Sequence, residues 1–172
     1  MLFSHTGFKV DYVTNPHGII AGTNTTNSFQ LGFQTGYKGQ YFNLVYGSDG
    51  FGFKDVLYLD YTGGFDVIDS FYLGINAAYS NSNDADAGYK GVALYLQKSF
   101  SKTFSLGLRP EFFTTTSTSK NTNQSAYTLS LNKKLSENLK IITELRHDTS
   151  KDVTFFGRNN LSGATLAAIY NF

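Results

Sequence analysis

Side chains of opposite charge stand two residues apart at three places in this sequence of 172 residues. Each place combines acidic and basic groups, so the available chemistry is ion pairing and electrostatic control of a polar surface. Residues two apart in a β-strand point to the same face, so each set would act together if its segment were a strand. The sets are Lys9 with Asp11, Arg109 with Glu111, and Glu144 with Arg146 and Asp148.

Nucleophilic catalysis is a second chemistry to weigh, because the sequence has three histidines. A hydrolase would need His147 to pair with Asp148 or with a nearby serine. Adjacent strand residues point to opposite faces, so His147 and Asp148 cannot readily form an orienting hydrogen bond. His5 lies near the N-terminus and His17 in a turn. We therefore expect no enzyme activity and no catalytic residue.

The sequence carries no pattern typical of a metal, phosphate or nucleic-acid site. It has no cysteine, hence no thiolate ligand. The acidic stretch 81–86 lacks the downstream Gly and Glu of a calcium loop. The glycines at 47, 50 and 52 are not followed by a helix. A net charge of +1 does not suggest nucleic acid as a partner. We expect no cofactor and no metal.

Alternation of apolar and polar residues is the main pattern along the chain, and it indicates β-strands. From Phe71 to Tyr79 every second residue is apolar, and the residues between them are mostly small or polar. A soluble sandwich would place charged residues on its outer face. Charged residues make up only 16% of this chain, against roughly 25% in soluble domains. We expect the apolar face to meet lipid, with a soluble sandwich or lipocalin-like barrel as the alternative.

These strands predict an all-β fold, a transmembrane antiparallel up-and-down barrel forming a single domain over residues 1–172. Short turns at 38–40, 101–103 and 136–138 contrast with long polar connections at 81–88, 114–125 and 149–160. About eleven strands are expected. They span 6–13, 19–24, 28–37, 41–47, 55–62, 70–80, 89–100, 104–113, 126–135, 139–148 and 161–172.

An odd count is unusual, because single-chain bacterial barrels normally have an even number of strands. One explanation is a misread hairpin, at the short segment 19–24 or at 63–69. The other, which we favour, is that N-terminal strands precede Met1 and that the complete barrel has 12 or more. An open barrel would leave backbone groups unpaired in lipid, at several kcal/mol each.

Aromatic residues and the C-terminus fit the same interpretation. Phe and Tyr collect near the expected strand ends, as in the aromatic girdles of outer-membrane barrels. The last strand ends in an alternating stripe closed by the final residue, and this stripe resembles the signal read by the outer-membrane assembly machinery. We therefore expect that machinery and the lipid bilayer as partners. The stripe consists of Leu166, Ala168, Tyr170 and Phe172.

The charged sets fall on the polar faces of their strands. An Arg or Lys facing lipid at the midplane would cost roughly 2–4 kcal/mol, so the interior is the expected location. There the charges would either constrict a pore and tune ion passage or brace the wall as ion pairs, and both roles are compatible. Because both signs are present, we do not expect strong selectivity. The pore-lining candidates are Lys9, Asp11, Arg109, Glu111, Glu144, Arg146 and Asp148.

Three phrases resemble the OmpL-like putative β-barrel porin family: HTGFKVDY at 5–12, GVALYLQKSFSKTFSLGLRPEFF from Gly91, and ELRHDTS from Glu144. The resemblance covers nearly the whole chain, as the C-terminal portion of a longer family barrel. It implies a pore in the bacterial (Gram-negative) outer membrane but carries over no binding site. Pro110 departs from the family pattern, and we expect a bulge or break there.

The expected function is an outer-membrane porin-like channel for passive diffusion of small hydrophilic solutes. The alternative is a structural or docking barrel, a subunit of a larger envelope complex whose wall or loops bind other outer-membrane proteins.

Overall fold

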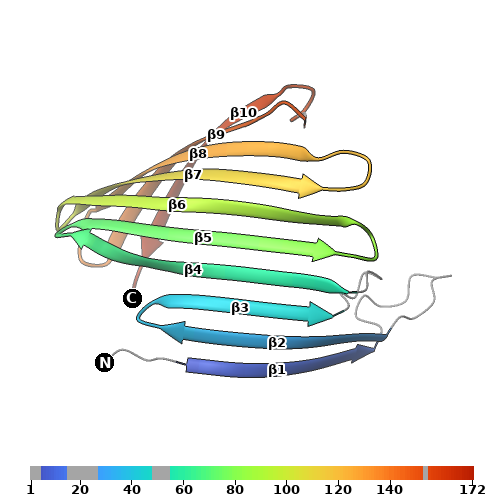
Figure 1. The fold of residues 1–172 in the computed structure, drawn as a ribbon. Helices are drawn as coiled ribbons and strands as arrows, with labels where there is room; N and C mark the ends of the chain where they lie inside the picture. Colours follow the sequence, from blue (N-terminus) through green and yellow to red (C-terminus); the bar gives the residue numbers. More distant parts are fainter. Residues whose placement is uncertain (1–4, 15–26, 48–54, 153–154) are drawn as a thin grey trace. The chain divides into compact units, whose positions relative to one another are not determined.

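The computed structural model describes residues 5–14, 27–47, 55–152 and 155–172. Within these ranges the chain forms ten β-strands and no helix (Figure 1). No helix there is long and apolar enough to cross a membrane. The strands are β1 (His5–Thr14), β2 (Asn27–Tyr37), β3 (Gln40–Gly47), β4 (Val56–Ile68), β5 (Phe71–Ser82), β6 (Ala87–Ser101), β7 (Phe104–Thr116), β8 (Thr122–Lys134), β9 (Leu139–Ser150) and β10 (Asn160–Tyr170).

Neighbours in the sheet are neighbours in the sequence, since the hydrogen-bonded order runs from β1 to β10 without a crossover. Pairing is antiparallel from β1 through β4 and again from β8 through β10. This is an up-and-down arrangement, in which each strand returns beside the previous one. The prediction of an all-β antiparallel up-and-down fold is confirmed. Closure into a barrel is not observed among the described residues, because β1 and β10 lie at the two ends of the strand order and do not pair with each other.

The prediction of eleven strands is wrong for the described residues, which form ten. The expected strand 19–24 falls in 15–26, outside the described residues. Residues on either side of that stretch are hydrogen-bonded partners, because Thr14 of β1 pairs with Asn27 of β2.

Several strands are longer than the alternation predicted. β4 continues through Gly63 and Gly64 to Ile68, across the segment that we expected to be a connection. β7 ends at Thr116 and β8 begins at Thr122, which leaves 117–121 between them instead of 114–125. Consecutive threonines favour extended backbone, and this explains the added length at the end of β7. β7 also continues through Pro110, so the expected break is not observed.

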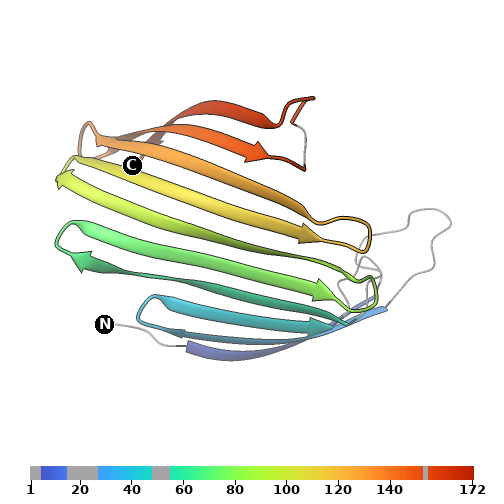
Figure 2. The same ribbon diagram turned by 45° about the horizontal axis from the view of Figure 1, so that its top comes forward.

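The chain divides into two compact units. Unit 1 consists of 1–63, 77–90 and 115–121, and unit 2 of 64–76, 91–114 and 122–172. In unit 1, β2 and β3 form a hairpin (Figure 2) in which Tyr37 pairs with Gln40. The two residues between them, Lys38 and Gly39, have φ angles of 49° and 78°. Two successive positive φ angles define the tight turn whose twist matches that of its strands.

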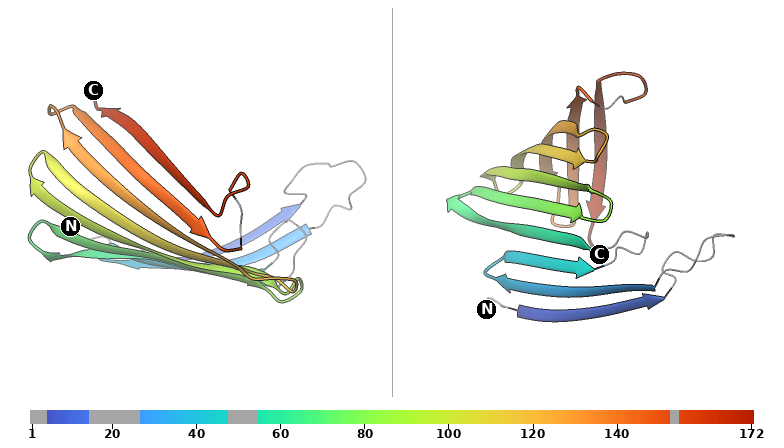
Figure 3. Two further views of the ribbon diagram at one scale, coloured as in Figure 1. Left: turned by 90° about the horizontal axis from the view of Figure 1, so that it is seen from above. Right: turned by 45° about the vertical axis from the view of Figure 1, so that its right-hand side comes forward.

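Burial along β8 in unit 2 is the reverse of that in a soluble sheet. Figure 3 shows β8, β9 and β10 as successive strands of the sheet, with β9 between the other two. Thr128 is only 2% exposed, whereas the adjacent Tyr127 and Leu129 are 44% and 37% exposed. In the described part of the chain, only Val56, Ala93 and Ala126 are buried hydrophobic residues. The sheet therefore has an apolar face without an apolar core beneath it.

Candidate functional site

The candidate site lies on the polar face of β7, β8 and β9 in unit 2. The register places Thr128 opposite Arg146, and Ser130 opposite Glu144. Residues directly opposite each other in antiparallel strands share a face, and so do residues two apart along one strand. Pleating and register therefore bring polar residues of different strands together without any loop.

Arg146 is the centre of this arrangement. Its Nε donates to both carboxylate oxygens of Asp148, at 3.1 and 3.0 Å, and its Nη2 donates to Oδ1 at 2.9 Å. Its Nη1 donates to Glu111 of β7 and lies 3.4 Å from Oγ1 of Thr128. Such forked, charge-assisted bonds are stronger and more directional than neutral ones. Arg146 thus ties β7, β8 and β9 together on the polar face.

Arg109 of β7 is held differently. Its Nε lies 3.4 Å from Oε1 of Glu111, and its guanidinium lies over the ring of Tyr95 at 5.9 Å. The Nε atom is buried and has no hydrogen-bond partner among the described residues. Arg109 therefore belongs to the same cluster as Arg146 but is less fully engaged.

The structure thus brings together four of the predicted residues: Arg109, Glu111, Arg146 and Asp148. Their side chains are 23% to 39% exposed, whereas Leu145, next to Arg146 on β9, is 51% exposed. Charged groups less exposed than the neighbouring leucine indicate that the polar face is the sheltered one. That the cluster lines a pore stays a prediction.

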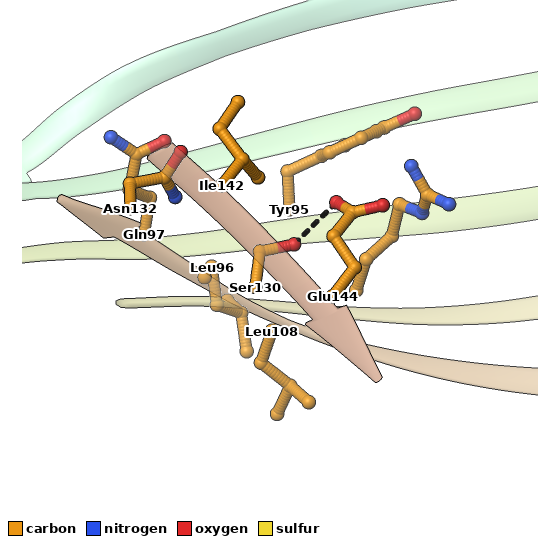
Figure 4. Close-up of a pocket in the computed structure, with 10 residues that line it drawn as sticks. Tyr95, Leu96, Gln97, Leu108, Ser130, Asn132, Ile142 and Glu144 are labelled. Carbon is orange, nitrogen blue, oxygen red and sulfur yellow. Dashed lines mark hydrogen bonds between the residues drawn. The ribbon is translucent and has the colours of Figure 1, made fainter. Parts of the chain in front are cut away.

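Glu144 stands apart from the ion pairs and belongs to a pocket of about 220 Å³ on the same face. Oγ of Ser130 donates a 2.6 Å hydrogen bond to Oε1 of Glu144 (Figure 4). Tyr95 and Gln97 of β6 also line the pocket, together with Asn132 of β8. Sequence reasoning missed these pocket residues, although their places on the polar faces of alternating strands were a usable signal.

Lys9 and Asp11 lie in β1, opposite Gly32 and Gln30 of β2. Their side chains lie outside what the structure describes, so the predicted role of this pair is not tested.

A second polar row occupies unit 1 and was not predicted. Nε2 of Gln34 donates to Oδ1 of Asn43 at 2.6 Å, and Nδ2 of Asn43 donates to Oδ2 of Asp60 at 3.0 Å. These residues are register partners across β2, β3 and β4. Asn43 and Asp60 each alternate with apolar residues, and that alternation is the signal that could have identified them.

His147 forms a hydrogen bond on the opposite, apolar face. Its Nδ1 lies 2.8 Å from Oγ of Ser162, its register partner on β10. Asp148 points to the other face and binds Arg146. The orienting hydrogen bond between His147 and a carboxylate that a catalytic triad needs is therefore not formed by this neighbour. His17 lies outside the described residues.

The C-terminal stripe is exposed. Leu166 and Tyr170 are 74% and 61% exposed, and Phe172 is fully exposed. The rings of Tyr170 and Phe172 lie 6.4 Å apart. The arrangement presents apolar side chains along one side of β10, and a role in assembly stays a prediction.

The described residues contain no group of three potential metal ligands among His, Cys, Asp and Glu. No curated protein shows significant similarity to this sequence. The sequence does match a family of barrel-forming proteins from residue 3 to residue 172, which is nearly its whole length. This match agrees with the antiparallel strand order and with the exposed apolar face. The chain belongs to the family described as putative beta-barrel porin-2, OmpL-like.

Proposed function

We propose that this protein is an outer-membrane channel through which small hydrophilic solutes diffuse passively. One observation carries the proposal: along the middle of β8 and β9 the polar residues at 128, 130, 144, 146 and 148 are buried or partly buried, while the leucines at 129, 131 and 145 are exposed. A strand that is apolar outside and polar inside suits a wall between lipid and a watery interior. Membership of a porin family supports the same function.

The charge cluster suits the wall of such a channel. Arg146 joins three strands through Glu111, Thr128 and Asp148, so fixed charges are held at one height of the wall. Rings and rows of fixed charge are the usual means by which a protein pore discriminates among ions. Acidic and basic groups occur together here, so we expect weak selectivity.

The direct test is conductance of the full-length protein in planar lipid bilayers. We expect discrete current steps when folded protein is added. Bilayers that stay silent with protein shown to be folded would overturn the proposal. A stable complex with another outer-membrane protein, recovered in detergent, would then favour the docking role.

A charge-neutralising variant tests whether the polar face meets the solute path. Glu144→Gln removes one negative charge while leaving an oxygen to accept the bond from Ser130. In water, two unit charges about 4 Å apart interact with an energy of roughly 1 kcal/mol. Loss of this interaction between Glu144 and a passing ion should raise the anion-to-cation permeability ratio by up to about fivefold. The matched control is Glu137→Gln, in the connection between β8 and β9. Equal shifts in reversal potential for both variants would contradict the placement.

We further propose that the protein is not an enzyme, because Asp148 faces away from His147 and is bound to Arg146. The test is hydrolysis of a chromogenic fatty-acyl ester by the folded protein and by His147→Ala. Activity that disappears in the variant would contradict this proposal.

A further inference from the structure

The pocket beside the ion-pair cluster has the chemistry of a binding site for a small solute. Its polar lining consists of Tyr95, Gln97, Arg109, Ser130, Asn132 and Glu144, carried by β6, β7, β8 and β9 of unit 2. At about 220 Å³ it is smaller than the sites for drug-sized ligands, which start at roughly 300 Å³. Its size therefore suits a single small ring or short chain.

Several hydrogen-bonding groups in this pocket are not used by the protein. The side-chain amides of Gln97 and Asn132, both drawn in Figure 4, have no hydrogen-bond partner among the described residues. Oε1 of Glu144 accepts the hydrogen bond from Ser130, so Oε2 remains available as an acceptor. Arg109 has an ion pair with Glu111 but no hydrogen bond within the described part of the chain.

These groups offer donors and acceptors together. Each amide presents an acceptor oxygen and a donor nitrogen, Arg109 adds donors, and Glu144 adds an acceptor. The formal charges of Arg109 and Glu144 cancel, so a neutral ligand meets no net charge in the pocket. A hydroxyl group can donate and accept at once, which matches a mixed lining of this kind.

One of the residues that line the pocket, Gly107, is a glycine that packing does not require. A Cβ added at Gly107 would lie 3.6 Å from Cβ of Ser130 and no closer to any other atom, which is ordinary contact. By contrast, a Cβ at Gly74 would meet the ring of Tyr72 at 2.8 Å. Glycine within a strand often marks a close approach by a ligand or another backbone. Here the nearby backbone leaves room for a side chain.

We propose that this pocket is a binding subsite for small, neutral, polyhydroxylated solutes of about monosaccharide size. The inference rests on the proposed channel function, because such a subsite lies on the face assigned to the interior. Binding is weak, since a solute that passes through a channel must also leave its subsite.

The test is equilibrium binding of D-glucose to the full-length protein folded in detergent micelles, measured by calorimetry. We expect saturable binding in the millimolar range. Triethylene glycol dimethyl ether, a probe of similar mass that only accepts hydrogen bonds, should show no saturable binding. Absence of saturable glucose binding, or equal binding of the two probes, would overturn the proposal.

Variants identify the pocket as the place of binding. Gln97→Leu and Asn132→Leu should each weaken glucose binding by about fivefold, as expected for loss of one or two hydrogen bonds. Gly107→Leu should weaken glucose binding further, because its side chain would occupy part of the pocket. The two amide variants keep the test valid if Gly107→Leu fails to fold. The matched control is Gln124→Leu on β8, outside the pocket. Unchanged binding in both amide variants would overturn the assignment.

Failure of this inference and failure of the channel proposal give different results. Conductance steps without glucose binding would remove the subsite and leave the channel. Glucose binding in micelles with silent bilayers would keep the subsite and remove the channel.

Discussion

Two arginines on the same face of neighbouring strands are in different situations. Arg146 donates to Asp148, Glu111 and Thr128, whereas Arg109 has one ion pair and stacks over Tyr95. A guanidinium has five donors in a rigid fork, so its role depends on how many of them the protein uses. Arg146 is therefore suited to bracing the wall, and Arg109 retains donors for a solute.

Replacement of Arg146 should reduce stability. Arg146→Met leaves Glu111 and Asp148 without their shared partner on a sheltered face. Groups of this kind cost about 1–3 kcal/mol when left unsatisfied, reduced here by partial solvent access. Urea unfolding of the detergent-folded protein would measure the loss. The control is Arg158→Met, at an exposed residue between β9 and β10, for which we expect a change below about 0.5 kcal/mol. Equal losses would contradict the bracing role.

At the scale of the element, each strand combines two surfaces, and each turn must reverse the chain without distorting the register. On β8 the side chains at 127, 129 and 131 are exposed, while those at 126 and 128 are buried. The turn between β2 and β3 needs only two residues because both adopt positive φ angles. The exposure of the strand residues and the φ angles of the turn can therefore be tested by separate substitutions.

The lipid-facing assignment of β8 predicts a cost that depends on depth. Leu129→Arg near the middle of the strand should lower the free energy of unfolding by roughly 2–4 kcal/mol in lipid bilayers. Leu135→Arg, just beyond the end of β8, should cost at most about 1 kcal/mol, because an interfacial arginine can reach water. Both leucines are exposed, at 37% and 59%. Equal costs at the two positions would argue against a membrane-facing strand.

The positive φ angle at Gly39 predicts backbone strain in an alanine variant, even though an added Cβ would meet no neighbouring atom. A Cβ at Gly39 and one at Gly163 both meet nothing within 4 Å, but only Gly39 has a positive φ, at 78°. Gly39→Ala should therefore destabilise the protein by about 1–2 kcal/mol. Gly163→Ala should be neutral or slightly stabilising. Thermal unfolding in detergent would compare them, and a neutral Gly39→Ala would contradict the turn geometry.

At the scale of the whole molecule, stability cannot come from an apolar core. Among the described residues only three hydrophobic side chains are buried, whereas large apolar side chains are exposed on most strands. In lipid the fold must instead satisfy its backbone groups through strand pairing. The order from β1 to β10 provides that pairing between consecutive strands. Such an arrangement suits a membrane, and a dependence on the machinery that inserts outer-membrane barrels stays a prediction.

The C-terminal stripe predicts a defect in assembly without a defect in stability. Phe172→Ala should lower the amount of folded protein in outer membranes of cells, because the terminal residue belongs to the proposed recognition stripe. Its unfolding free energy in detergent should change by less than about 0.5 kcal/mol, since Phe172 is fully exposed. Phe156→Ala, at a residue 95% exposed in another connection, is the control. Normal membrane levels of Phe172→Ala would contradict the stripe's role.

The sequence by itself determined the strand type, the two faces and the family. Alternation is a local property, because neighbouring strand residues must point to opposite sides. It was therefore enough to place Arg109, Glu111, Arg146 and Asp148 on polar faces. Strand ends were less predictable, as β7 and β8 show, since polar Thr and Ser residues continue a strand wherever a partner strand supplies hydrogen bonds.

Tertiary structure decided which strands pair and which side chains meet. β1 pairs directly with β2, with Thr14 opposite Asn27. Register brought Arg146 to Glu111, 35 positions away, and placed Ser130 against Glu144. It also brought Gln97, Gly107 and Asn132 together as lining residues of one pocket. These contacts join residues far apart in the chain, and a local pattern carries no information about the register between strands.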